Sequence, residues 1–125
     1  MRSSFVDGPY PRQERPWGWY ETVLEDQGYL VKRLWIAPGQ RLSLQRHRQR
    51  EEHWVVVAGG GTLHLDGHET PLLVGQSIHI PTGAVHRASA AEAGLLIVEV
   101  QRGERLSEDD IERLSDDYGR AGTTC

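Results

Sequence analysis

The stretch TLHLDGHETPLLVGQSIHI, residues 62–80, decides the fold class of this chain. It holds three short runs of alternating or β-branched residues, which predict strands at Thr62–Asp66, Thr70–Val74 and Ser77–Ile80. Asp66-Gly67 lies between the first two runs and is the strongest hairpin signal in the sequence, and Gly75 marks the next turn. Short strands that follow one another through tight turns are typical of an all-β sandwich or barrel.

The same pattern continues on both sides of this stretch. Fourteen glycines and six prolines divide the chain into short segments. Pro38-Gly39, Gly59-Gly60-Gly61 and Pro81-Thr82-Gly83 carry the residues that favour turns. The remaining predicted strands are Trp17–Val23, Tyr29–Ala37, Arg41–His47, Glu52–Ala58 and Gly94–Gln101. With about eight strands in all, the sequence predicts a small all-β barrel.

The C-terminal part of the chain breaks the strand pattern. Ser107 and Asp110 have the spacing of a helix capping box, and Ile111 and Leu114 follow at helical spacing. We therefore expect one short helix over Ser107–Tyr118, folded onto the barrel. The predicted organisation is an N-terminal arm at residues 1–16, one domain at residues 17–120 that includes the helix, and a tail at residues 121–125.

Composition excludes several classes of protein. With 125 residues, 38% apolar and 26% charged, the chain can form one core and is not compositionally disordered. No apolar run approaches the length of a membrane span, and residues 1–15 lack the apolar segment of a secretory signal. A net charge of -4 without a basic block argues against nucleic acid as a partner, and the single Cys125 excludes a disulfide framework. We expect a cytoplasmic domain that binds neither a membrane nor nucleic acid.

Six histidines in a chain of this length make metal chemistry worth testing. The segment PGQRLSLQRHRQREEHWVVVAGG, residues 38–60, holds the first candidates. Gln45 and His47 share one face of their predicted strand, and Glu52 opens the next strand. An imidazole, an amide oxygen and a carboxylate form a ligand set for a divalent first-row metal, although a polar hairpin without metal fits the same pattern. The nearby Arg46, Arg48 and Arg50 are interpreted as a solvated stretch.

A second segment, GQSIHIPTGAVHR at residues 75–87, places His86 just after the tight turn that Pro81 and Gly83 predict. Together the two segments resemble the paired motifs of the cupin superfamily, although Ala90 replaces the asparagine that usually ends the second motif. The resemblance implies a jelly-roll barrel, or double-stranded β-helix. It also implies a bound divalent metal ion, with Zn²⁺ expected first and Co²⁺, Mn²⁺, Ni²⁺ or iron as alternatives.

A closer resemblance covers nearly the whole chain, from Arg15 to Arg120. The chain is similar to the C-terminal isomerase domain of the bifunctional type II phosphomannose isomerase/mannose-1-phosphate guanylyltransferase family. We find no counterpart here of that family's guanylyltransferase half, with its glycine-rich nucleotide loop, so nucleotidyl transfer is not expected. The matching segments, in order, are RPWGWYE (15–21), VKR (31–33), PGQRLSLQ (38–45), EHWVVV (52–57), IPTGAVHR (80–87), VEVQ (98–101) and EDDI…DDYGR (108–120).

The resemblance implies a set of metal ligands, with one point left open. Where the bifunctional relatives have three consecutive histidines, this chain has His47, Arg48 and Gln49. A general cupin pattern would use Gln49. The other class of phosphomannose isomerase, also a cupin, uses a Gln-x-His pair, a glutamate and a distant histidine. We favour that second scheme, whose ligands here are Gln45, His47, Glu52 and His86.

His53 is the remaining alternative ligand. It should face away from its neighbour Glu52 on the same strand, which favours a packing or supporting role.

The resemblance implies metal-dependent interconversion of mannose 6-phosphate and fructose 6-phosphate, for the supply of nucleotide-sugar and polysaccharide precursors. This reaction needs a metal, a base and a cationic pocket for the phosphate. Glu99, a polar residue in an otherwise apolar strand, is the candidate base. Lys32 or Arg33, of which only one can face inward, and Arg87, which follows a ligand, are the candidate phosphate-binding cations.

Two other functions fit the same residues. One is a cupin that oxidises a small molecule with iron and oxygen, and the other is a non-catalytic cupin that binds a sugar or another metabolite. For the isomerase we expect a small sugar phosphate as the ligand. We also expect a homodimer, formed by pairing of sheets or by exchange of an N-terminal strand.

Overall fold

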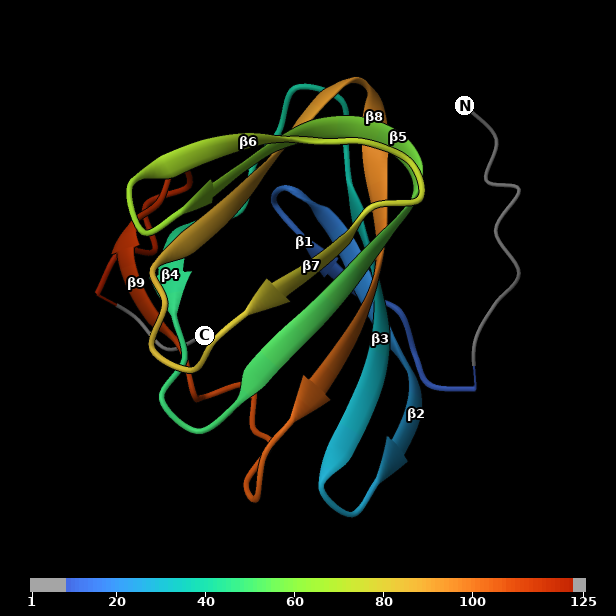
Figure 1. Cartoon of the computed structure of the whole chain (residues 1–125), viewed down its shortest axis with the longest axis vertical. Coiled ribbons are helices and arrows are strands. Elements are labelled where there is room, and N and C mark those ends of the chain that lie inside the picture. The colour runs from blue at the N-terminus through green and yellow to red at the C-terminus, as the bar shows by residue number, and fades with distance from the viewer. Residues whose placement is uncertain (1–8, 123–125) are drawn as a thin grey trace.

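The computed structural model describes residues 9–122, and these residues form an antiparallel all-β barrel (Figure 1). The predicted all-β barrel is therefore confirmed. A single curled sheet has the order β1-β2-β3-β8-β4-β9, and β5 pairs with β8 and also carries β6 and β7. The strands are β1 (Gln13–Arg15), β2 (Gly18–Asp26), β3 (Tyr29–Ile36), β4 (Leu44–Arg46), β5 (Glu51–Leu65), β6 (His68–Leu72), β7 (Ser77–Ile80), β8 (His86–Arg102) and β9 (Glu112–Ser115).

The two longest strands, β5 and β8, form the framework of the barrel (Figure 1). They pair from Glu51 opposite Arg102 to Leu65 opposite His86, with two register shifts between these ends. The predicted strands 52–58 and 62–66 therefore belong to one continuous strand. Glycine permits this pairing, because a Cβ on Gly59 would overlap the carbonyl oxygen of Gly94 on β8.

Strand alternation sorts the side chains of β5 and β8 into an inner and an outer face. Trp54, Val56 and Ile97 are buried in the apolar core, whereas Val55 and Val57 are exposed on the outside. The inner face turns polar where β5 begins and β8 ends. Glu52, Glu99 and Gln101 lie there and are at most 3% exposed. Buried polar groups of this kind need partners, and they locate the candidate site.

The C-terminal prediction was wrong, because residues 107–118 form no helix. Ser107 does accept a hydrogen bond from the Asp109 backbone N–H at its Oγ (3.1 Å), but the chain makes only a turn there. It then enters β9, which pairs with β4. Pairing with a distant strand, supported by the Arg46–Glu112 ion pair at 2.9 Å, outweighs the local helical signal.

The N-terminal prediction also differs in part from the structure. Residues 13–15 of the expected arm form β1, which pairs with β2 of the same chain. Residues 1–8 of the arm and residues 123–125 of the expected tail lie outside the described residues. Within residues 9–122 there is no helix long and apolar enough to cross a membrane.

Candidate metal centre

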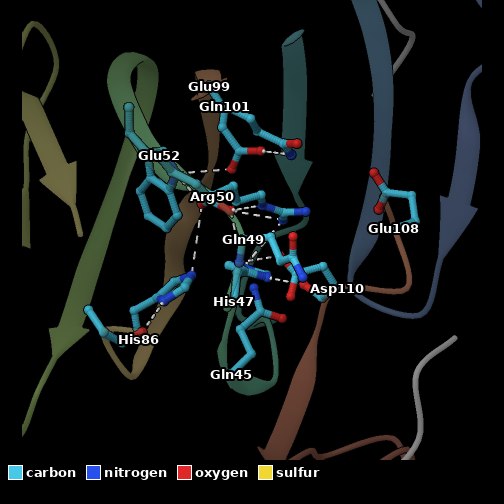
Figure 2. Close-up of polar contacts among 12 residues, drawn as sticks. Gln45, His47, Gln49, Arg50, Glu52, His86, Glu99, Gln101, Glu108 and Asp110 are labelled. Atoms are coloured by element: carbon cyan, nitrogen blue, oxygen red, sulfur yellow. Dashed lines mark hydrogen bonds and ion pairs between the residues drawn. The ribbon is translucent and has the colours of Figure 1, made fainter. Parts of the chain in front are cut away.

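Three buried side chains from separate parts of the chain converge inside the barrel (Figure 2). His47 follows β4, Glu52 lies near the start of β5, and His86 begins β8. The Nε2 atom of His47 lies 3.1 Å from Oε2 of Glu52, and the Nε2 atom of His86 lies 3.8 Å from Oε1. One potential ligand atom from each residue lies within 4.8 Å of the other two. This is the spacing of a small cation site.

Backbone carbonyls orient both imidazoles. The Nδ1 atoms of His47 and His86 lie 2.7 Å from the Asp110 carbonyl oxygen and 3.0 Å from the Ala84 carbonyl oxygen. Because a carbonyl can only accept, each Nδ1 donates a hydrogen bond to its carbonyl, and each Nε2 is directed toward Glu52. Histidine ligands of metal ions are commonly held in this way.

His86 provides the test of whether a metal fits. Its Nε2 is buried and has no hydrogen-bond partner within the described part of the chain. Burial lowers the pKa of His86 and outweighs the attraction of Glu52, so the ring is neutral. A buried, neutral nitrogen lone pair aimed at a carboxylate is a suitable ligand for a transition-metal ion, and these residues therefore fit the predicted metal.

The other candidate ligands differ in whether they lie beside the His47–Glu52–His86 cluster. Gln45 lines the same cavity, opposite His86 in the β4–β8 pairing, and its Oε1 accepts a hydrogen bond from the Ser43 hydroxyl at 2.8 Å. Gln49 is exposed in the turn before β5, where its backbone N–H donates to Asp110. His53 is on the outer face of β5. The structure thus brings Gln45 beside the cluster but not Gln49 or His53.

Arg50, interpreted from the sequence as part of a solvated stretch, is only 6% exposed and belongs to the site. Its Nε and Nη2 atoms lie 3.0 and 2.9 Å from Oε2 of Glu52, and Nη2 lies 3.3 Å from Nε2 of His47. Burial alone would raise the pKa of Glu52, but the hydrogen bond from His47 and the charges of His47 and Arg50 lower it well below its usual value. The sequence could have indicated this position, because Arg50 is two residues from Glu52 and residues at that spacing share one face of an extended chain.

Glu99 also points inward, as the base prediction requires. The indole N–H of Trp54 lies 3.0 Å from both Oε1 of Glu52 and Oε1 of Glu99, and the Gln101 amide donates to Oε2 of Glu99 at 2.8 Å. Burial, followed by the nearby charge of Glu52, raises the pKa of Glu99 to about 7. Two buried carboxylates in one cavity thus have pKa values shifted in opposite directions (Figure 2).

The three predicted cations lie in different places. Lys32 lines the cavity, with Nζ 2.6 Å from Glu108 and 4.2 Å from the centre of the Tyr20 ring. Arg33, its neighbour on β3, faces the other way and pairs with the buried Glu21. Arg87 is buried outside this cavity and donates to the carbonyls of Leu42 and Ser115. The cavity is also lined by cations that the sequence analysis did not select: Arg15, Arg113 and Arg120.

Several curated proteins match this chain over most of its length. It is 48% identical over 107 residues to the alginate biosynthesis protein AlgA of Pseudomonas aeruginosa, and 44% identical over 107 residues to a mannose-1-phosphate guanylyltransferase of Escherichia coli. Each match covers 85% of this chain and 22% of the relative. The chain therefore spans about a fifth of the length of these relatives.

Solved structures with a similar fold include KdgF from Halomonas sp., with a TM-score of 0.70 and 19% identity, covering 82% of this chain and 96% of the other. An RmlC-like cupin from Shewanella frigidimarina has a TM-score of 0.69 and 17% identity, covering 83% and 94%. These likenesses show the cupin fold. The family model described as mannose-6-phosphate isomerase C-terminal matches residues 10–116. With this match over most of its length, and a candidate metal-ligand cluster inside a cupin barrel, the chain belongs to the mannose-6-phosphate isomerase C-terminal family.

Proposed function

We propose that this chain is a metal-dependent aldose–ketose isomerase that interconverts mannose 6-phosphate and fructose 6-phosphate. The observation that carries the proposal is the His47–Glu52–His86 cluster at a cavity that His47 and Glu52 line together with a separate buried carboxylate, Glu99, and a group of cations. These are the three parts that the reaction needs. The names of the relatives, in alginate synthesis and in guanylyl transfer to mannose 1-phosphate, support a place in polysaccharide precursor supply.

The metal would be held by His47, Glu52 and His86, with the amide oxygen of Gln45 as a further ligand. A divalent ion there would withdraw electrons from the sugar oxygens on C1 and C2 and stabilise negative charge that develops on them. Arg50 fixes one carboxylate oxygen of Glu52, and the two backbone carbonyls fix the imidazoles. The ligands are therefore oriented before any ion binds.

Glu99 is the group proposed to move the proton. In the open-chain form of mannose 6-phosphate its carboxylate removes the proton from C2. The C–H electron pair then forms the C1–C2 double bond, and the carbonyl pair moves onto O1. Glu99 returns the proton to C1 as the C2 hydroxyl proton passes to O1, which gives the C1 hydroxyl and C2 carbonyl of fructose 6-phosphate. Trp54 and Gln101 hold the carboxylate in place for both transfers.

Cations in the cavity would bind the phosphate. Lys32 and the guanidinium groups of Arg15, Arg113 and Arg120 line it, and arginine binds phosphate with paired hydrogen bonds. Arg33 and Arg87 face other parts of the molecule, so Lys32 is the residue of the original three that suits this role.

The test is to incubate the purified chain with mannose 6-phosphate and Zn²⁺ or Co²⁺ and to measure fructose 6-phosphate. Turnover that requires the metal is the expected result. No turnover from a folded, metal-loaded sample would overturn the isomerase and favour the non-catalytic cupin. Oxygen uptake with bound iron would instead favour the dioxygenase. The sugar phosphate, the homodimer and the cytoplasmic location stay predictions.

A further inference from the structure

A second cluster of potential metal ligands lies on the outer face of the barrel, where β5 and β7 run side by side (Figure 1). His53 on β5 is directly opposite His79 on β7, so both imidazoles are on the same face of the sheet. Their rings are stacked, with centroids 4.6 Å apart and planes at 15°. Glu51 lies two residues before His53 and therefore shares this face.

The three side chains converge on one point. The Nε2 atoms of His53 and His79 lie 2.7 and 3.2 Å from the same carboxylate oxygen, Oε1 of Glu51. As in the interior, one ligand atom from each residue lies within 4.8 Å of the others. The geometry is held by two paired strands, which leaves little freedom to be lost when an ion binds.

This cluster is open to solvent, unlike the one inside the barrel. The side chains of Glu51, His53 and His79 are 31%, 44% and 52% exposed. The cation nearest to Glu51 besides the histidines is Arg102, whose Nη1 lies 3.9 Å from Oε1 and whose side chain is 64% exposed. An ion can therefore reach the ligands from water and keep water molecules in its remaining coordination positions.

We propose that Glu51, His53 and His79 form a surface site for a divalent transition-metal ion such as Zn²⁺ or Cu²⁺, separate from the interior centre. Two imidazoles and one carboxylate favour Zn²⁺, Cu²⁺ or Ni²⁺ over Mg²⁺ or Ca²⁺, which prefer oxygen ligands alone. Since β7 pairs only with β5 among the described strands, an ion bound by both strands would fasten β7 to the barrel. The proposal stands independently of the isomerase function.

The first test is the number of Zn²⁺ ions bound per chain, measured by titration calorimetry. The wild-type chain should bind two ions, and His79→Ala and His86→Ala should each bind one. His64→Ala is the matched control, because His64 is also on β5 near a carboxylate, 3.9 Å from Glu69, but has no second imidazole. This control should still bind two ions. A His79→Ala variant that binds as many ions as the wild-type chain would overturn the surface site.

A second measurement needs no variant and so does not depend on how His86→Ala folds. The side-chain NMR signals of His53 and His79 in the wild-type chain should shift together as Zn²⁺ is added. Their common midpoint should lie at least about tenfold below that of the exposed His68, which belongs to neither cluster. Shifts of His53 and His79 over the same concentration range as His68 would mean adventitious binding and would overturn the proposal.

Discussion

The guanidinium group of Arg50 lies against the carboxylate of Glu52, with two of its nitrogens 3.0 and 2.9 Å from Oε2. Both residues are buried, and the charge of Arg50 adds to the hydrogen bond and charge of His47 in lowering the pKa of Glu52. The other oxygen, Oε1, accepts the Trp54 N–H and lies on the side of His86. One carboxylate oxygen thus contacts both Arg50 and His47, and the other contacts Trp54 and faces His86.

Replacing Arg50 with methionine should destabilise the metal-free chain by about 3 to 5 kcal/mol, because the buried carboxylate of Glu52 would lose its arginine countercharge. Added Zn²⁺ should recover part of this loss, since the ion would replace the countercharge. Urea unfolding with and without Zn²⁺ measures both effects. Arg48→Met is the matched control, because that side chain is 71% exposed, and it should change stability little. Equal stability of the two variants would contradict the role given to Arg50.

Glu99→Gln should lower kcat for mannose 6-phosphate by about 10²- to 10⁴-fold, because the amide cannot take the C2 proton. The amide has nearly the same shape, so Zn²⁺ binding should stay close to that of the wild type. Steady-state kinetics and calorimetry separate the two effects. Glu92→Gln, an exposed glutamate on the same strand, should leave kcat unchanged. A Glu99→Gln variant with wild-type kcat would remove Glu99 as the base.

Lys32→Met should raise KM for mannose 6-phosphate by about tenfold or more, through the loss of one charged contact with the phosphate. Arg33→Gln provides the comparison from the opposite face of β3. It should leave KM unchanged but lower the free energy of unfolding, because Arg33 pairs with Glu21, which is 1% exposed. Kinetics and urea unfolding of both variants test this division. A rise of KM in Arg33→Gln alone would reverse the assignment.

Removing the metal should abolish turnover without unfolding the barrel, because the core residues and strand pairings do not involve the ligands' ring nitrogens. Dialysis against a chelator, followed by activity measurement and circular dichroism, tests both statements. Zn²⁺ or Co²⁺ added back should restore activity. Activity that survives complete chelation would show that the reaction needs no metal.

Asp116 should make stability depend on pH in the acid range. Its carboxylate accepts hydrogen bonds from Arg120, at 2.7 Å from the backbone N–H and 3.0 Å from Nε. Burial would raise the pKa of Asp116, but these hydrogen bonds and the charge of Arg120 lower it below its ordinary value. The stabilisation is therefore complete above the unfolded-state pKa of about 4 and is lost as the pH falls through the lower folded-state value.

The corresponding variant is Asp116→Asn, compared with wild type by urea unfolding at several pH values. The difference in free energy of unfolding should be about 1 to 2 kcal/mol at pH 7 and should shrink toward pH 3. Asp109→Asn, at an exposed position, should show little difference throughout. A difference for Asp116→Asn that is constant over this range would mean that its charge contributes nothing.

Local signals predicted most of the strands. Asp66 and Gly67 have positive φ angles of 47° and 83°, as a two-residue hairpin turn needs, and β6 begins directly after them. Local signals failed to predict the secondary structure where pairing with a distant strand determines it. Residues 112–115 join β4 although their own spacing favours a helix, and Gly59 continues a strand because β8 lies close beside it.

Strand alternation likewise predicted which side chains share a face in the site. It put only one of Lys32 and Arg33 on the inner face, whereas the inward direction of Glu99 became clear only from the structure. Strand alternation was not applied to Arg50, because its position among Arg46 and Arg48 was interpreted as a solvent-exposed stretch. The partner that buries this charge, Glu52, is only two residues away, but the closure of the barrel around the pair depends on contacts far along the chain, such as that with the Ser107 carbonyl.

Three consecutive residues of β5, Glu51, Glu52 and His53, point alternately outward, inward and outward. Deleting or inserting one residue here would reverse the inner and outer faces for the rest of the strand. The carboxylate of Glu52 would lose its buried countercharge, and the imidazole of His53 would be forced into the interior of the barrel. Homologous proteins that keep both sets of side chains should therefore vary in length at the turns but not within this triplet.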